Sequence, residues 1–74
     1  MKYKYYIGII REDNSIKYVT KIDRDTKCAF WTDGEPAMVF TKTTADDYAF
    51  GLTVNGFCAA VIKLPAFYEP RNIA

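Results

Sequence analysis

The chain has 74 residues, half of them apolar and 16% aromatic, and its ten basic side chains nearly balance nine acidic ones. This length predicts one domain, residues 1–74, because two domains would each be too short to bury a core. The small net charge does not favour strong general attraction to nucleic acid or anionic lipid, and no apolar run approaches the ~18 residues of a membrane helix.

Three strands are predicted in the first half of the chain. Residues 3–11 place Tyr3, Tyr5, Ile7 and Ile9 on one face and Lys4, Tyr6, Gly8 and Ile10 on the other. A second alternating segment covers 16–22, and a third strand is expected over 27–32. The connecting segments EDNS (12–15) and DRDT (23–26) have the composition of turns.

The second half is predicted to hold a helix and a returning strand. Asp33-Gly34 is the strongest hairpin signal, but Pro36 has no amide for tight pairing, so 37–40 is expected to be a short strand or an extended lead-in. A helix follows, with Thr43 as N-cap and Asp46 at its third position, and it ends at Asn55-Gly56. The apolar segment 58–64 predicts a buried strand, and residues 66–74 form a tail.

These elements, in the order β-β-β-(β)-α-β, predict an α+β fold. We expect a two-layer domain with one antiparallel sheet of four to five strands and one helix packed on one face. So small a domain buries little surface, and its many aromatic residues are one way to fill the core. Dimerisation is another remedy, so a homodimer is kept as an alternative.

The predicted helix has two apolar faces. The face expected against the sheet consists of Ala45, Tyr48, Ala49 and Leu52. A second cluster lies on the other side and consists of Asp47, Phe50, Gly51 and Val54. Either Phe50 bends over a sheet edge or under the tail, or the second cluster is a surface that contacts a protein, with Gly51 allowing close approach.

Residues suited to catalysis or metal binding are scarce. The chain has no histidine, which excludes imidazole acid–base chemistry and an ordinary zinc site. Asp46 and Asp47 point about 100° apart on the helix, near the end where acidic residues are expected anyway. We therefore predict no enzyme activity, no metal and no cofactor. The two cysteines, Cys28 and Cys58, are expected to be reduced and buried in strands, with a disulfide or a reactive thiol as alternatives.

Binding of single-stranded nucleic acid is the second functional hypothesis. An antiparallel sheet that exposes aromatic rings beside lysines can stack unpaired bases. The candidate residues are Tyr3, Lys4, Tyr5, Lys17, Tyr18, Lys21 and Trp31. The same rings also suit core and cross-strand packing, which is the simpler interpretation.

Three segments carry a resemblance: KYVTKID (17–23), AFWTDGEPAMVFTK (29–42) and AFGLTVNGFCAAV (49–61). They resemble small proteins encoded by prophages and mobile elements of Gram-positive bacteria. The resemblance implies an accessory protein that acts by binding a host or element protein, and it brings no catalytic residues with it. Because the N-terminus also lacks the apolar region and cleavage site of a signal peptide, we expect a cytoplasmic interaction protein with an unidentified protein partner and no membrane contact.

Overall fold

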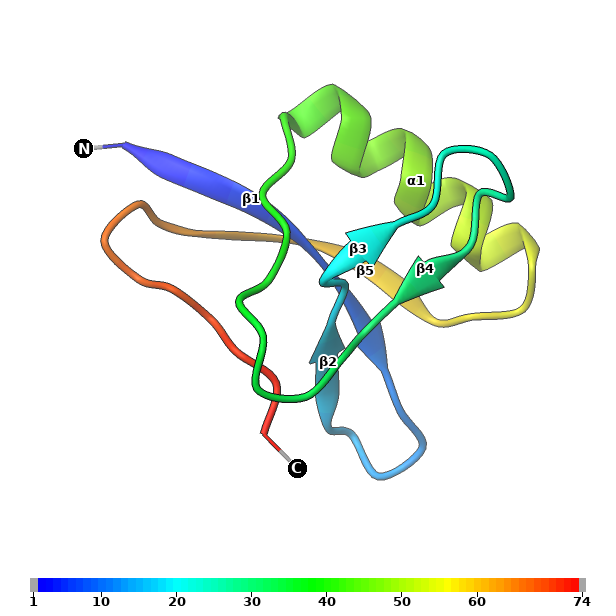
Figure 1. The fold of residues 1–74 in the computed structure, drawn as a ribbon, viewed down its shortest axis with the longest axis horizontal. Helices are drawn as coiled ribbons and strands as arrows, with labels where there is room; N and C mark the ends of the chain where they lie inside the picture. The colour runs from blue at the N-terminus through cyan, green and yellow to red at the C-terminus, as the bar shows by residue number, and fades with distance from the viewer. Residues whose placement is uncertain (1, 74) are drawn as a thin grey trace.

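The α+β class is confirmed by a computed structural model, which describes residues 2–73. Strand β1 (Tyr3–Ile10) is the centre of a three-stranded antiparallel sheet, with β2 (Ile16–Tyr18) on one side and β5 (Ala59–Pro65) on the other. The helix α1 (Lys42–Val54) packs on β5 and β1. Figure 1 shows α1 running in the opposite direction to β5.

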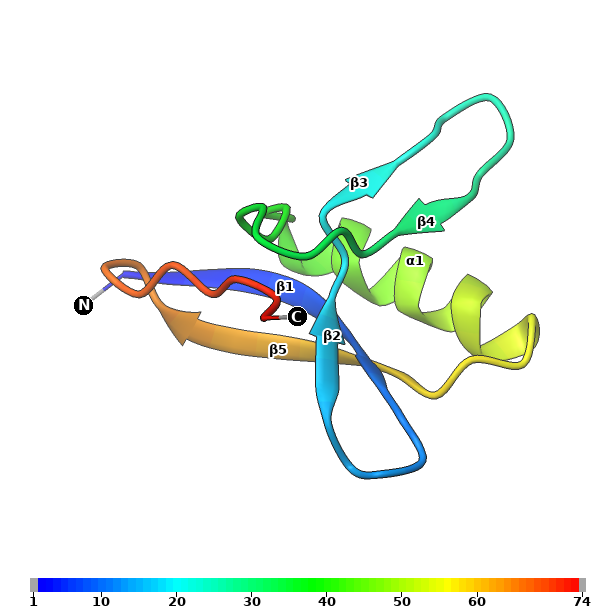
Figure 2. The same cartoon turned by 60° about the horizontal axis from the view of Figure 1, so that its bottom comes forward.

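The remaining two strands form a separate sheet, so the expected single sheet is divided. Strands β3 (Lys21–Ile22) and β4 (Ala29–Phe30) pair only with each other among the described residues. The predicted strand 16–22 is interrupted at Val19, whose amide bonds to Ile7 of β1, whereas the next amide, of Thr20, bonds to Phe30. The chain changes its partner at this point, and the β3–β4 hairpin projects away from the sheet (Figure 2).

The segment between β4 and α1 is extended and does not form the hairpin suggested by Asp33-Gly34. Gly34 has the positive φ of 81°, but Asp33 does not share it, so the type I′ geometry is absent. Instead, Pro36 forms a bridge with Arg71 and Phe40 forms one with Tyr5. Of the two expectations for residues 37–40, the extended lead-in is correct.

The start of α1 differs from the prediction, whereas its end agrees with it. The N-cap is Thr41, whose hydroxyl accepts a bond from the Thr44 amide at 3.3 Å, so the prediction of Thr43 with Asp46 at the third position is wrong. The C-terminal end is as predicted: Gly56 has a φ of 95°, its amide bonds to the Thr53 carbonyl, and the Phe57 amide bonds to the Leu52 carbonyl. This pair of bonds is a Schellman motif.

The core lies between α1 and the sheet and is closed by segments from both halves of the chain. The predicted inner face of α1 is confirmed, since three of its residues are buried and Tyr48 packs beside them. The buried cluster consists of Ile7, Ile9, Val19, Phe40, Ala45, Ala49 and Leu52. On the opposite face of β1, Tyr6 is buried and its hydroxyl donates to the Tyr68 carbonyl at 3.4 Å.

The C-terminal segment is fastened to the outer edge of β2. The side chain of Asn72 accepts a bond from the Tyr18 amide at 2.7 Å and donates one to the Tyr18 carbonyl at 2.8 Å. Pro70 is buried and accepts a bond from the Ala37 amide. The tail, which carried little sequence pattern, therefore acts as a further strand-like partner for β2 and for the lead-in to α1.

Candidate protein-contact site

The outer helix surface, defined as Asp47, Phe50, Gly51 and Val54, is available for contact. The side chains of Phe50 and Val54 are 72% and 69% exposed. The first interpretation of Phe50, that it bends over a sheet edge or under the tail, is therefore wrong. Because the buried residues of α1 fix its orientation, these two apolar side chains face outward together.

Gly51 occupies a position that no packing among residues 2–73 explains. A Cβ atom built there would meet no heavy atom within 4 Å, apart from its chain neighbours and its own helix backbone. Glycine inside a helix costs up to about 1 kcal/mol relative to alanine. The described fold thus carries this cost without using the space that the missing side chain leaves.

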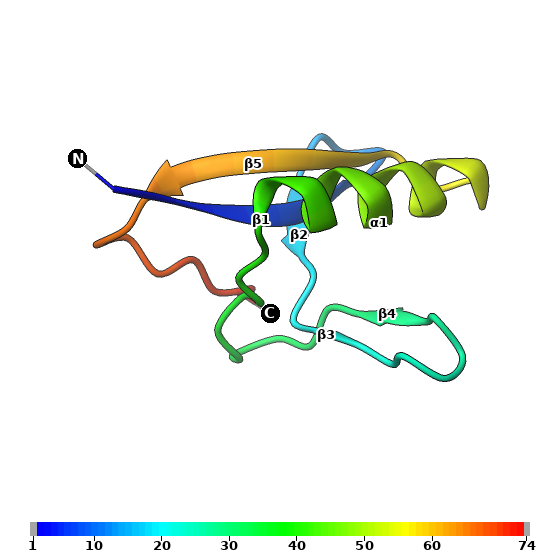
Figure 3. The same cartoon turned by 90° about the horizontal axis from the view of Figure 1, so that it is seen from above.

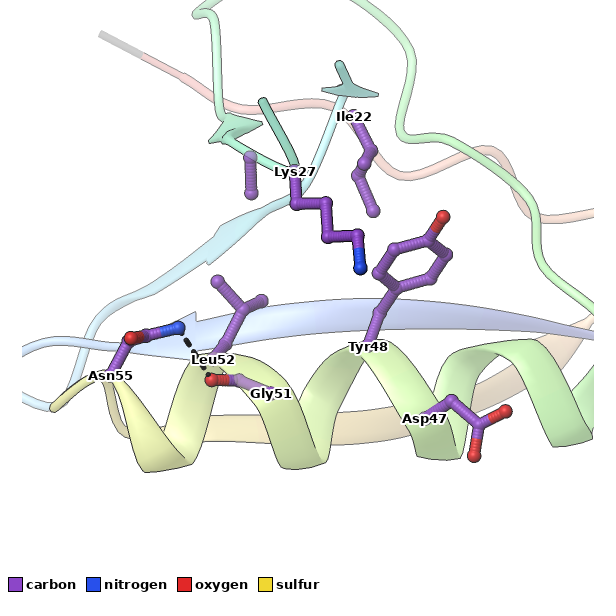
Figure 4. Close-up of a pocket in the computed structure, with 8 residues that line it drawn as sticks. Ile22, Lys27, Asp47, Tyr48, Gly51, Leu52 and Asn55 are labelled. Carbon is purple, nitrogen blue, oxygen red and sulfur yellow. Dashed lines mark hydrogen bonds between the residues drawn. The ribbon is translucent and has the colours of Figure 1, made fainter. Parts of the chain in front are cut away.

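A cavity of about 350 Å³ opens between α1 and the β3–β4 hairpin, and we call it the helix–hairpin cleft. Figure 4 shows side chains from both elements converging on it. Its lining consists of Ile22, Lys27, Ala29, Asp47, Tyr48, Gly51, Leu52 and Asn55. Two residues of the outer helix surface, Asp47 and Gly51, therefore also line the cleft.

The lining of the cleft combines apolar walls with few polar groups. Ile22, Ala29 and Leu52 supply aliphatic surface, and Tyr48 supplies a ring. Lys27 has a φ of 59°, an uncommon left-handed conformation for a residue with a side chain, and its side chain extends into the cleft (Figure 4). Asn55 donates to the Gly51 carbonyl at 2.9 Å. This chemistry suits an apolar side chain that has a carboxylate or carbonyl group near it.

The sequence did not reveal this cleft because the cleft depends on the position of the hairpin. A single sheet would have placed residues 21–30 beside β1 and β2, without a cavity against α1. The partial signals in the sequence were the unexplained Gly51 and the polar turn 23–26. Neither feature predicts a cleft by itself, because the cleft exists only where the chain leaves the sheet at Val19.

The candidate nucleic-acid residues are not brought together on one surface. The side chains of Tyr3, Tyr5 and Lys17 lie on the helix side of the sheet, because their strand positions alternate with those of Lys4 and Tyr18 on the other side. Lys21 and Trp31 belong to the hairpin region.

Several of these side chains are already engaged within the chain. Lys17 Nζ lies 2.6 Å from Asp33 Oδ1 and donates to the Ile73 carbonyl at 2.9 Å, and its side chain is only 15% exposed. The Trp31 ring packs edge-on against Phe57, with a centroid distance of 5.6 Å. Lys63 Nζ lies 4.4 Å above the Tyr3 ring, a cation–π contact.

The ring of Tyr18 is also engaged, and it belongs to a tyrosine cluster that is partly buried. Tyr18 packs edge-on against Tyr6, with a centroid distance of 6.2 Å. Burial raises the pKa of Tyr6, with a smaller effect from the nearby Glu69 carboxylate. The pKa of Tyr18 is likewise raised, first by burial and then by Tyr68 and Tyr6. These phenols stay neutral at physiological pH and act in packing.

The acidic pair Asp46 and Asp47 and both cysteines lie at the surface of the described structure. Asp46 pairs with Lys42 at 3.2 Å on the helix surface. No group of three or more cysteine, aspartate or glutamate side chains gathers in the described part of the chain as a metal site would require. Cys28 and Cys58 are free thiols and both are exposed, so the expectation that they are buried is wrong.

Comparison with protein-family models, with curated proteins and with solved structures finds no match for this chain. What can be stated is therefore the class: a small α+β domain with an exposed apolar helix surface beside a cleft. The resemblance to proteins of mobile elements stays a prediction. Over residues 2–73, no helix has the length and apolar character needed to cross a membrane.

Proposed function

We propose that this protein acts by binding another protein through the outer helix surface, with an apolar side chain of the partner seated in the helix–hairpin cleft. The observation that carries the proposal is the position of Gly51, which leaves unfilled space between the exposed Phe50 and Val54 and the mouth of the cleft. Apolar residues exposed beside a concave apolar surface are typical of protein-contact sites.

The expected energetics follow from the exposure of the two anchor side chains. In the free protein most of the Phe50 side chain is exposed to water. Its burial by a partner would therefore add a favourable free energy of binding that does not already contribute to folding. Central aromatic anchors of an interface commonly contribute at least about 2 kcal/mol, which corresponds to roughly 30-fold in affinity. The apolar side chain of the partner that enters the helix–hairpin cleft would add a further favourable free energy through its contacts with the walls of the cleft.

The biological setting remains the one that the resemblance suggests. A small accessory protein of a prophage or mobile element that modulates host machinery would need a binding surface and no catalytic groups. The support for this setting is the sequence resemblance, together with a surface suited to contact.

The test compares two exposed phenylalanines, one on the outer helix surface and one in the C-terminal tail. Peptides selected from a random display library for binding to the wild-type protein are measured against Phe50→Asp and, as the control, Phe67→Asp. Phe67 is 84% exposed in the tail, so both variants should fold. We expect Phe50→Asp to weaken binding at least about tenfold and Phe67→Asp to leave it unchanged. Equal effects of the two variants, or no saturable binder, would refute the proposal.

The nucleic-acid alternative is tested in the same preparation, although no particular observation favours it. The fluorescence of Trp31, the single tryptophan, is followed while mixed-sequence single-stranded DNA or RNA is added at low salt. Phosphate contacts release counterions and weaken steeply as salt rises. A saturable signal that disappears with added salt would support the alternative, and peptide binding that is insensitive to salt would support the protein contact.

A further inference from the structure

The outer edge of β5 carries backbone groups without partners in residues 2–73. Two backbone hydrogen bonds fix the pattern at the ends of the strand: the Ile10 amide donates to the Cys58 carbonyl, and the Ala66 amide donates to the Lys2 carbonyl. In an antiparallel pair such bonded positions alternate, so Ala60, Ile62 and Leu64 bond to β1. The amides and carbonyls of Ala59, Val61 and Lys63 therefore point away from β1, toward the side of β5 where the described chain has no further strand.

The position of Pro65 agrees with this assignment. It has the same parity as the three outward residues, and a proline has no N–H to donate. A proline can occupy this edge position of β5 without the loss of a bond to β1. The free edge thus has three residues with both a donor and an acceptor, and it ends at the proline.

We infer that this edge pairs with the same edge of a second copy of the chain, which forms an antiparallel β5–β5 ladder and a continuous six-stranded sheet. An unpaired row of amides and carbonyls accepts an extended strand. Self-pairing uses all three outward residues of each copy in one register, with Val61 opposite Val61 and Ala59 opposite Lys63. The next register toward Pro65 places the proline nitrogen, which has no hydrogen, opposite Ala59 of the other copy. The next register in the other direction places Lys63 opposite a residue that precedes β5 in the other copy.

The charges are compatible with a second copy in this register. The net charge of +1 gives two copies little reason to repel. The two Lys63 residues lie four strand positions apart across the dyad, or ~13 Å, which exceeds the screening length of about 8 Å at physiological salt. Each Lys63 instead faces Ala59 of the other copy, and Ala59 packs in the same core cluster as Leu52 in the last turn of α1.

That end of the helix lacks a basic residue of its own. The last turn of α1 contains no lysine or arginine, although cations stabilise the negative end of a helix dipole. Lys63 of the second copy supplies one in exchange for its cation–π contact with Tyr3, because its side chain lies on the helix side of the sheet. Figure 3 shows β5 on one side of α1 and the β3–β4 hairpin on the other, so the ladder leaves the helix–hairpin cleft open. This inference does not rest on the proposed function.

Amide hydrogen exchange tests the ladder residue by residue. Exchange is followed by NMR from micromolar to millimolar protein, and mass is followed by sedimentation over the same range. We expect Ala60, Ile62 and Leu64 to be protected at every concentration, because they bond to β1. Ala59, Val61 and Lys63 should become protected only as the mass doubles. A monomer at all concentrations, or a dimer whose odd-numbered amides exchange freely, overturns the inference.

A pair of substitutions at one position tests the register. In the dimer, Ala59→Glu and Ala59→Lys place an opposite or a like charge against Lys63, at two places. Cross-strand charge pairs of this kind predict a dimer about fourfold or more tighter for Ala59→Glu than for Ala59→Lys. The protection of Ala60 and Ile62 verifies that both variants keep β5 paired with β1. Equal dimer affinities of the two folded variants overturn the register.

Discussion

Replacement of Gly51 by alanine should make the protein more stable and a poorer binder. The built Cβ has no heavy atom within 4 Å beyond its chain neighbours and its own helix backbone, so the methyl group fits without displacing any side chain. Gly51 is the fourth residue from the end of α1, and in a helix interior alanine is preferred to glycine by up to about 0.8–1.0 kcal/mol. The added methyl group also narrows the mouth of the helix–hairpin cleft, because Gly51 lines it.

The size of the stability change can be measured directly. In a domain of 60–100 residues, 1 kcal/mol corresponds to a shift in Tm of roughly 4–8 °C. Thermal and urea unfolding, followed by far-UV circular dichroism and by Trp31 fluorescence, should both show the increase. Peptides that bind through the outer helix surface should bind the variant more weakly, although its fold is more stable.

The same substitution at Gly8 is the control, because there the outcome reverses. A Cβ at Gly8 would lie 2.5 Å from Ile62 Cδ1 and 2.8 Å from Ile16 Cγ2, so both contacts must be relieved by movement. Ile16 is 43% exposed and Ile62 is half-buried, so their rearrangement should cost at most about 1–3 kcal/mol, the cost of overpacking in a core. If Gly51→Ala destabilises the protein, or if both variants change stability in the same direction, the account of Gly51 as unfilled contact space is refuted.

Two further predictions concern the tail and the turns. Asn72→Ala leaves the amide and carbonyl of Tyr18 without their partner and should lower the free energy of unfolding by about 1–3 kcal/mol in urea titrations, whereas Arg71→Ala, at an exposed neighbour, should have the smaller effect. Acid should also destabilise the protein. The pKa of Asp13 is lowered by bonds from the Ser15 hydroxyl and amide, and that of Asp23 by bonds from the Asp25 and Thr26 amides. Since these pKa values are lower in the folded state, their stabilisation is present above the ordinary value of 3.8 and is lost as the pH falls through the folded-state values. In urea titrations against pH, the double variant Asp13→Asn, Asp23→Asn should lose less stability than the wild type below that point, and a parallel acid loss in both proteins would contradict the assignment.

The sequence was sufficient for those elements that local interactions determine. The inner face of α1 follows from helical periodicity, and its end follows from the positive φ that Gly56 adopts. Strands β1 and β5 were also predicted within one or two residues, because a long apolar or alternating run pairs well in any sheet. The N-cap was misplaced by two residues, since TKTT offers three threonines and the capping one is decided by where the lead-in leaves β1.

Elements that depend on distant partners could not be predicted in the same way. The segment 16–22 has one unbroken alternation, and nothing in that pattern shows that Val19 is buried against β1 while Thr20 pairs with β4. The Asp33-Gly34 signal describes a local preference, but Pro36 pairs with Arg71 from the other end of the chain. The exposure of Cys28 results from the same rearrangement, because Cys28 lies in the loop that the hairpin carries away from the sheet.

The candidate site contains residues placed by local helix periodicity and residues placed by distant strand pairing. Only the first group could be identified from the sequence. The phase of the helix placed Phe50 and Val54 on the side away from the sheet, although it left open whether Phe50 was covered, and Gly51 was identified as an unexplained cost. The residues opposite them, Lys27 and Ile22, reach α1 only because the chain changes partner at Val19. A substitution that weakens this change of partner would therefore open the cleft without touching α1. The stability of the β3–β4 hairpin and the affinity of the outer helix surface for a partner should accordingly be coupled.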